Sequence, residues 1–227
     1  MYRGSVWFLP ALFAGMLAAS FAFAESPMSV DDAGTLGKGG MKIEGVWHRD
    51  EETRGGALAF GFGPTETLEV EIGASHERDT DASPGITLRG VGVAAKWVPY
   101  QNELGWSLGA RFDYGRTRAE GETEHACALT GLASYRFMND QVLHLNAGAV
   151  HVIAPGDRET LHAWGIGYEY PLLQGLQLTA EIFGEERSGP DKALGLRYEI
   201  FDGFKASAAI GHGNDRSFGQ AGFAWEF

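Results

Sequence analysis

The sequence predicts an all-β protein: an up-and-down antiparallel β-barrel of about twelve strands that crosses a membrane. Three observations predict this fold. Apolar and polar residues alternate along most of the chain, which indicates strands because successive side chains of a strand point to opposite faces. Tight turns alternate with longer, charged connections, as in a meander. The first residues have the pattern of an export signal.

Residues 1–24 are predicted to be a secretory signal peptide. Arg3 provides a positive start, an apolar run from Val6 to Ala19 follows, and Ala22-Phe23-Ala24 forms a small-residue cleavage site before Glu25. The complete chain has 18 basic and 30 acidic residues, a formal charge of −12. Loss of Arg3 leaves 17 basic and 30 acidic residues, or −13. We therefore expect an exported, acidic protein.

Composition excludes several classes of protein. The chain has 227 residues, and the hydrophobic share of 44% is too high for a disordered chain. An acidic chain without a basic cluster along its sequence is a poor nucleic-acid binder, because that affinity depends on neutralising phosphates. A single cysteine, Cys127, excludes an intramolecular disulfide framework and a multi-cysteine zinc site. The 33 glycines lack a collagen period.

Period-two alternation extends from Met41 to the C-terminus. In the segment that begins at Leu68, for example, Val70, Ile72 and Ala74 alternate with polar or small residues. Turn signals divide the chain into twelve predicted strands, and ten or fourteen remain open where a hairpin is split or merged. The predicted strands cover residues 40–48, 57–63, 68–76, 86–98, 106–116, 125–137, 142–152, 161–170, 176–184, 193–200, 204–211 and 218–227.

The connections between these strands form two alternating classes. An even number of strands returns both termini of the chain to the side of the tight turns, and asymmetric barrel ends are typical of outer-membrane barrels. Tight turns are predicted at 63–66, 99–105, 139–141, 171–175 and 202–203, and longer charged loops at 49–56, 77–85, 117–124, 154–160, 185–191 and 212–217.

Aromatic residues favour a membrane barrel over a soluble one. They gather near the predicted strand ends, as in the two interfacial girdles of a membrane barrel, whereas a soluble core places large aromatics nearer strand centres. The apolar face carries almost no charge along the middle of each strand, as lipid requires. The predicted girdle residues are Trp47, Trp97, Trp106, Tyr114, Trp164, Tyr170 and Trp225.

The polar face combines glycine and alanine with charges of both signs, which predicts a hydrated lumen. Two interpretations stay open: the charges set the selectivity of a pore, or they pair across the lumen and close it. Twelve strands lie between the eight that side chains fill and the sixteen or more that leave a wide channel. If a pore exists, the acidic excess favours cations. The candidate lumen residues are Glu71, Arg111, Asp113, Arg136, Glu181, Arg197 and Glu199.

The segment 25–39 between the predicted signal peptide and the predicted barrel (40–227) is polar and glycine-rich. We expect it to be flexible. It either folds into the lumen as a plug or remains a disordered leader, as is common at termini.

Three stretches resemble known outer-membrane proteins. Phe223, Trp225 and Phe227 alternate along the last residues, which resembles the C-terminal signal recognised by the outer-membrane assembly machinery. Residues 31–39 and 143–148, DDAGTLGKG and LHLNAG, resemble the family of putative outer-membrane transporters of the phenol-degradation meta pathway. That resemblance implies a barrel that passes small, hydrophobic or aromatic compounds, and it offers no catalytic residues.

The residues predict no catalytic, cofactor or metal site. Outer-membrane lipid hydrolases carry a His-x-Ser-Asn type motif, which is absent here, as is G-x-S-x-G. The histidines lack H-x-H or H-x₃-H spacing for a metal. We expect a channel or transporter for small solutes in the bacterial outer membrane, in contact with its lipid and lipopolysaccharide. The alternatives are a structural or surface-interaction barrel without an open pore and, third, a lipid-hydrolysing barrel.

Overall fold

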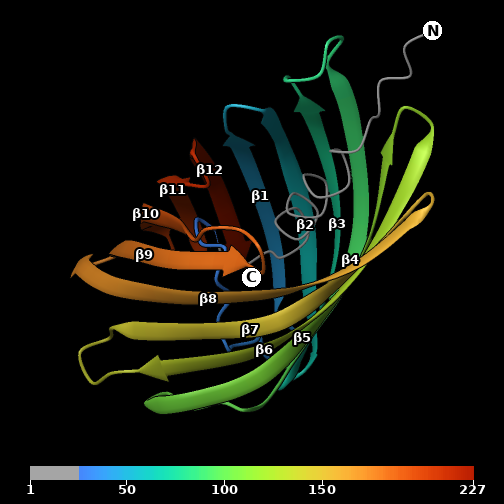
Figure 1. The fold of residues 1–227 in the computed structure, drawn as a ribbon. Helices are drawn as coiled ribbons and strands as arrows, with labels where there is room; N and C mark the ends of the chain where they lie inside the picture. The colour runs from blue at the N-terminus through green and yellow to red at the C-terminus, as the bar shows by residue number, and fades with distance from the viewer. Residues whose placement is uncertain (1–25) are drawn as a thin grey trace, which may run out of the picture.

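The structure, a computed structural model, describes residues 26–227 as one closed barrel of twelve antiparallel strands (Figure 1). The predicted fold class and strand number are confirmed, and the predicted signal peptide 1–24 lies outside the described residues. The strands are β1 (Met41–Arg49), β2 (Thr53–Thr65), β3 (Leu68–Asp79), β4 (Ile86–Tyr100), β5 (Gly105–Ala119), β6 (Glu122–Arg136), β7 (Val142–Ala154), β8 (Asp157–Leu173), β9 (Leu176–Glu185), β10 (Asp191–Phe201), β11 (Phe204–Gly213) and β12 (Arg216–Glu226).

Each strand pairs with its neighbours in sequence, and β1 pairs with β12 to close the sheet. At the closure, the N–H groups of Met41 and Phe227 each donate to the carbonyl of the other at 2.9 Å. Closure removes the sheet edges, so that the backbone groups of every strand have partners without water. Among residues 26–227, no helix is long and apolar enough to cross a membrane.

The two ends of the barrel are named here by the chain. The terminal rim is where β1 begins and β12 ends, and the distal rim is the opposite end. Connections contain two to five residues at the terminal rim and two to six at the distal rim. The predicted difference in loop length is therefore largely wrong.

Several of the predicted long loops are strand instead. β5 and β6 extend to a two-residue turn at Glu120 and Gly121, and β11 and β12 to one at Asn214 and Asp215. All four residues have positive φ, which suits the twist of a tight hairpin. The charged residues of these segments alternate between the two faces of the extended strands, where water can reach them beyond the bilayer.

The outward face is apolar between two aromatic belts. Outward side chains such as Ile72, Val93 and Leu196 are exposed along the middle of their strands. Trp97, Trp106, Tyr170 and Trp225 are exposed near the terminal rim, and Trp47, Tyr114 and Trp164 are exposed towards the distal rim. The three aromatic residues of the C-terminal pattern, Phe223, Trp225 and Phe227, also lie exposed on β12 or just after it.

A charge in the middle of the outward face is expected to destabilise the folded barrel. Ile72 lies on β3 between the two aromatic belts and is 60% exposed. We expect Ile72→Arg to lower the free energy of unfolding in lipid vesicles by about 2–4 kcal/mol, the range for a cation at mid-bilayer. Denaturant titration measures it, with Ile72→Ala as the control for lost side-chain volume. Equal stability of the two variants would contradict a lipid-facing position.

Candidate functional site in the barrel lumen

The inward face of the barrel carries the charged residues. Of the seven candidate lumen residues, five are buried inside: Glu71, Arg111, Asp113, Glu181 and Arg197. The other two, Arg136 and Glu199, have the same inward register but lie exposed at the terminal rim, next to the turns that follow β6 and β10. The alternation in the sequence predicted that these two side chains face inward, but it could not predict how far inside the barrel they lie.

Lys42 and Arg111 form the centre of a buried ion network between β1, β3 and β5. The Lys42 ammonium lies 3.5, 3.4 and 3.1 Å from the carboxylates of Glu44, Glu69 and Glu71. The Arg111 guanidinium lies 2.7 Å from Glu71 and 2.8 Å from Asp113. Buried charges need such partners, since an unpaired charge away from water is very costly.

The segment 26–40 lies within the ring of strands, where its blue trace can be followed in Figure 1. Its Asp31 carboxylate is buried and lies 3.1 Å from Lys96 Nζ and 3.4 Å from Arg111 Nη1. Asp32 approaches the same Lys96 ammonium at 2.9 Å. The segment thus contributes two carboxylates to the cations of β4 and β5.

Backbone groups of the segment are held by side chains from the opposite wall. The N–H groups of Ser29 and Val30 donate to one Glu181 carboxylate oxygen at 2.7 and 3.0 Å. The Asp31 N–H donates to Asn146 Oδ1 at 2.7 Å, and Asn146 returns a bond to the Asp31 carbonyl at 2.9 Å. A segment without secondary structure therefore still has partners for its buried polar groups.

The beginning of the segment is fixed in the same way. The Ser26 N–H donates to Glu44 at 2.7 Å, and the Ser26 carbonyl accepts from Arg197 Nε at 3.0 Å. Gln220 donates to the Pro27 carbonyl. Side chains of β1, β10 and β12 thus bind the first residues of the segment inside the barrel.

Inward-facing glycines leave the space that the segment fills. A Cβ added to Gly165 would lie 2.7 Å from the Val30 side chain, and one added to Gly167 would clash with the end of the Met28 side chain. Both contacts are shorter than real Cβ atoms show, so the Val30 side chain or the flexible end of Met28 would have to move to admit a side chain there. Met28 and Val30 also pack against Phe183 of β9. Small residues of the predicted lumen face therefore leave the space in which this segment packs against the wall.

Ser134, His144 and Glu169 lie in a line on β6, β7 and β8. Ser134 Oγ is 2.8 Å from His144 Nδ1, and His144 Nε2 is 3.7 Å from Glu169. Ser134 Oγ also accepts the N–H of Ala33 at 2.8 Å, which places it beneath the segment. The serine and histidine are buried, so a substrate carbonyl has no access to the hydroxyl in this conformation.

Among residues 26–227, no group of three or more histidine, cysteine, aspartate or glutamate side chains is arranged to hold a metal ion. Cys127 is a half-buried free thiol with the outward register of β6, opposite Tyr114 on β5.

Sequence reasoning singled out some of the wall residues that hold the segment, among them Glu181 and Arg197, and missed three others. Lys96, Ser134 and Asn146 have inward register and neutral or basic polar groups. Period two could give this register, but their common partner lies 64 or more residues earlier in the chain. The sequence signal that could have indicated this contact was the acidic pair Asp31-Asp32, together with lysine and arginine residues of inward register on the predicted strands.

Comparison with known proteins shows the family. The family model described as "Uncharacterised conserved protein UCP029691" matches residues 12–217. The chain belongs to this family. No curated protein matches its sequence. The resemblance of residues 31–39 and 143–148 to phenol-degradation transporters is not confirmed by this match.

Solved structures show the fold of bacterial outer-membrane barrels. The COG4313 outer membrane channel from Pseudomonas putida F1 is 11% identical with a TM-score of 0.66, covering 86% of this chain and 98% of that one. The KdgM porin is 11% identical with a TM-score of 0.63, covering 82% and 99%. The β domain of the Bordetella autotransporter BrkA is 16% identical with a TM-score of 0.57, covering 84% and 100%.

Neutralising Asp31 is expected to loosen the segment. In Asp31→Asn, Lys96 and Arg111 lose one charged partner while side-chain size is kept. Hydrogen bonds to charged groups contribute about 1.5–3 kcal/mol, so we expect amide exchange at Ser29 and Val30 to become faster by one to two orders of magnitude. Hydrogen exchange with mass spectrometry of the segment measures it.

The matched control is Lys38→Gln, which changes an exposed charge of the same segment. Equal protection of Ser29 and Val30 in the wild type and both variants would show that Asp31 does not hold the segment.

Proposed function

We propose that this protein is an outer-membrane channel for small solutes, and that segment 26–40 occupies its lumen in the closed state. The observation that carries the proposal is how the segment is held. Non-covalent contacts to side chains of the wall, through Asp31, Glu181 and Arg197, keep it in place, and it adds no strand to the sheet. Such a segment can leave without breaking the barrel.

The wall is suited to line a hydrated path once the segment leaves. Its buried charges then face each other across a lumen where water can solvate them, which relieves the cost of burial. A purely structural barrel of this size has no need of a charged interior, because apolar residues fill a core more favourably. The porin and channel folds among the similar structures support the same function.

Charge favours cations in the open state. In the described residues, the buried charged side chains comprise nine carboxylates and four lysine or arginine cations. Loss of Asp31 with the segment leaves eight against four. Rings of one sign of charge select ions of the opposite sign. Passage of neutral aromatic solutes is a finer proposal, which rests on residues 31–39 and 143–148 alone.

Deletion of residues 26–36 is expected to open the channel. The refolded mature chain, examined in a planar bilayer, should show rare or small conductance steps, and the deleted chain large and persistent ones. Heat-modifiable gel mobility checks that both are folded. A folded, deleted barrel without conductance would favour the structural barrel. Hydrolysis of phospholipid by the wild type, lost in Ser134→Ala, would favour the enzyme.

Selectivity is expected to depend on Glu181. In the deleted chain, Glu181 no longer holds Ser29 and Val30, so that Glu181→Gln reports on permeation alone. We expect it to reduce the cation preference measured as reversal potential in a salt gradient. The control is Glu186→Gln, an exposed carboxylate in the connection between β9 and β10 at the distal rim. An unchanged reversal potential in Glu181→Gln would contradict a lumen role for this carboxylate.

A further inference from the structure

The negative charge of the strands is confined to the inward face of the barrel. By strand register, every aspartate and glutamate of the twelve strands faces inward. The charged strand residues that face outward are all cations. They are Arg49, Arg54, Arg78, Arg89, Arg116, Arg118, Arg158 and Lys192. A chain with a net charge of −12 thus presents a positive outer surface near the distal rim.

Six of these cations form one patch on β1–β5. Arg49 lies opposite Arg54, and Arg54 lies opposite Arg78, on adjacent strands. Directly opposite residues have Cβ atoms about 5 Å apart, and like charges in such pairs destabilise a sheet. Arg89 and Arg118 form a third opposite pair, and Arg116 follows on the same face of β5. We call these six residues the arginine patch.

No ion pair or hydrogen bond to another side chain neutralises the arginine patch within residues 26–227. All six side chains are exposed. The patch begins two residues beyond Trp47 on β1 and two residues beyond Tyr114 on β5, on the side of the distal rim. These two aromatic residues mark the distal edge of the apolar belt. Its guanidinium groups therefore stand at the level of lipid headgroups.

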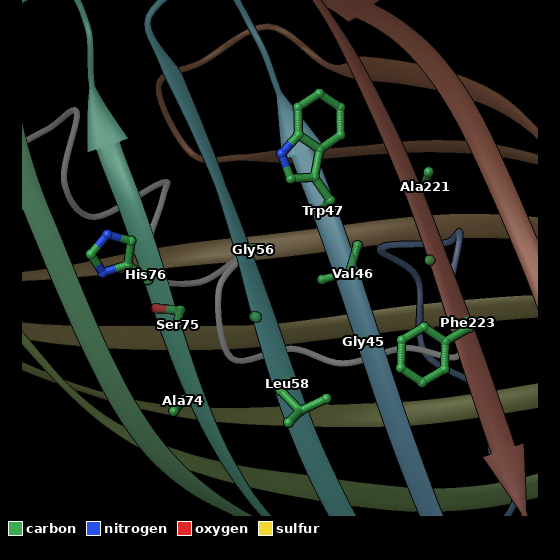
Figure 2. A pocket seen from close by; sticks show the side chains of 12 residues that line it. Gly45, Val46, Trp47, Gly56, Leu58, Ala74, Ser75, His76, Ala221 and Phe223 are labelled. Carbon is green, nitrogen blue, oxygen red and sulfur yellow. The ribbon is translucent and has the colours of Figure 1, made fainter.

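An apolar groove lies directly beneath the patch on the same outward face. Its volume is about 520 Å³, and Figure 2 shows Trp47, Leu58, His76 and Phe223 around it. Small residues form its floor: Gly45, Gly56, Ala74 and Ala221. Trp47 and His76 both lie opposite Gly56, two residues along their strands from Arg49, Arg54 and Arg78. The separation along each strand is thus about 7 Å.

The geometry points to a binding site for a phosphorylated, acylated glycolipid of the outer leaflet, the lipid A part of lipopolysaccharide. Arg49, Arg54 and Arg78 would bind a phosphate through charge-assisted hydrogen bonds, which the planar guanidinium makes in pairs. One acyl chain would lie in the groove between Trp47 and Phe223. The inference rests on the outer-membrane location, with the chain termini on the periplasmic side and the distal rim therefore at the outer leaflet, and it does not depend on channel activity.

Charge and shape together select this occupant. A zwitterionic phospholipid carries one phosphate, whose charge its own ammonium offsets, whereas a glycolipid with two phosphates supplies one to the row Arg49–Arg54–Arg78 and one to Arg89 and Arg118. A second protein copy would need carboxylates on its outward face, and the strands described here have none. The phosphate and the acyl chain of one lipid fit the patch and the groove at the same time.

The first test uses the wild-type mature chain in detergent and needs no variant. Native mass spectrometry measures its affinity for bisphosphorylated lipid A, for the same lipid without phosphates, for phosphatidylglycerol and for inorganic phosphate. We expect bisphosphorylated lipid A to bind at least about tenfold more tightly than each other probe, because several charge-assisted hydrogen bonds are lost without its phosphates. Equal affinity with or without phosphates would overturn the proposal.

Two other outcomes of this test also overturn it. Equally tight binding of phosphatidylglycerol would mean general attraction of anionic lipid. Equally tight binding of inorganic phosphate, which displaces no acyl chain, would mean an anion site without a role for the groove.

Variants then locate the site. We expect the triple variant Arg49→Gln, Arg54→Gln, Arg78→Gln to lose about tenfold in affinity for lipid A. The control, Arg158→Gln with Lys192→Gln, removes outward cations of β8 and β10 and should keep wild-type affinity. Ala74→Phe fills the groove and should lower the affinity for lipid A with phosphates and for lipid A without phosphates by the same factor. Wild-type affinity in the triple variant, with folding checked by gel mobility, would place the lipid elsewhere.

Discussion

The rest of the structure depends on one constraint: in lipid, every backbone N–H and C=O needs a partner within the protein. β1 and β12 meet this constraint by pairing with each other, which closes the sheet. Closure also divides the side chains into two sets, because alternate residues of each strand face lipid or lumen. Each later feature of the molecule follows from which residues fall into which set.

The inward set is too polar to form an ordinary core. Twelve strands enclose more space than these side chains fill alone, and small residues such as Gly165 and Gly167 widen it further. The segment 26–40 occupies that space, and it satisfies wall charges as it does so. Asp31 pairs with Lys96 and Arg111, while Glu181 accepts two N–H groups of the segment. Wall and segment therefore complete each other's polar contacts.

The chemical character of the outward set changes along the length of the strands. In the middle of each strand it is apolar, and at the aromatic belts it is amphipathic. Beyond Trp47 and Tyr114 it becomes positive, with no acidic strand residue to balance the arginines. The strand residues thus make the outward face net positive and the inward face net negative, although the same strands build both faces. This separation connects the proposed cation path inside with the proposed lipid site outside.

The sequence by itself predicted about twelve strands and which face of the sheet their residues occupy, because period two is a local property of the chain. It determined that Glu71, Arg111 and Glu181 face inward and that Trp97 and Trp225 face outward. It did not determine the turns at Glu120 and Asn214, since charged residues suit extended strands beyond the bilayer as well as loops. It left two fates open for residues 25–39.

Only the tertiary structure decided which residues meet. Asp31 and Asn146 are separated by 115 positions, and no local pattern relates them. Arg49, Arg54 and Arg78 become neighbours only through the register of β1, β2 and β3, which a shift of one residue would move to the other face. The position of the segment inside the barrel and the arginine patch outside it are therefore properties of closure and register, which no single stretch of sequence contains.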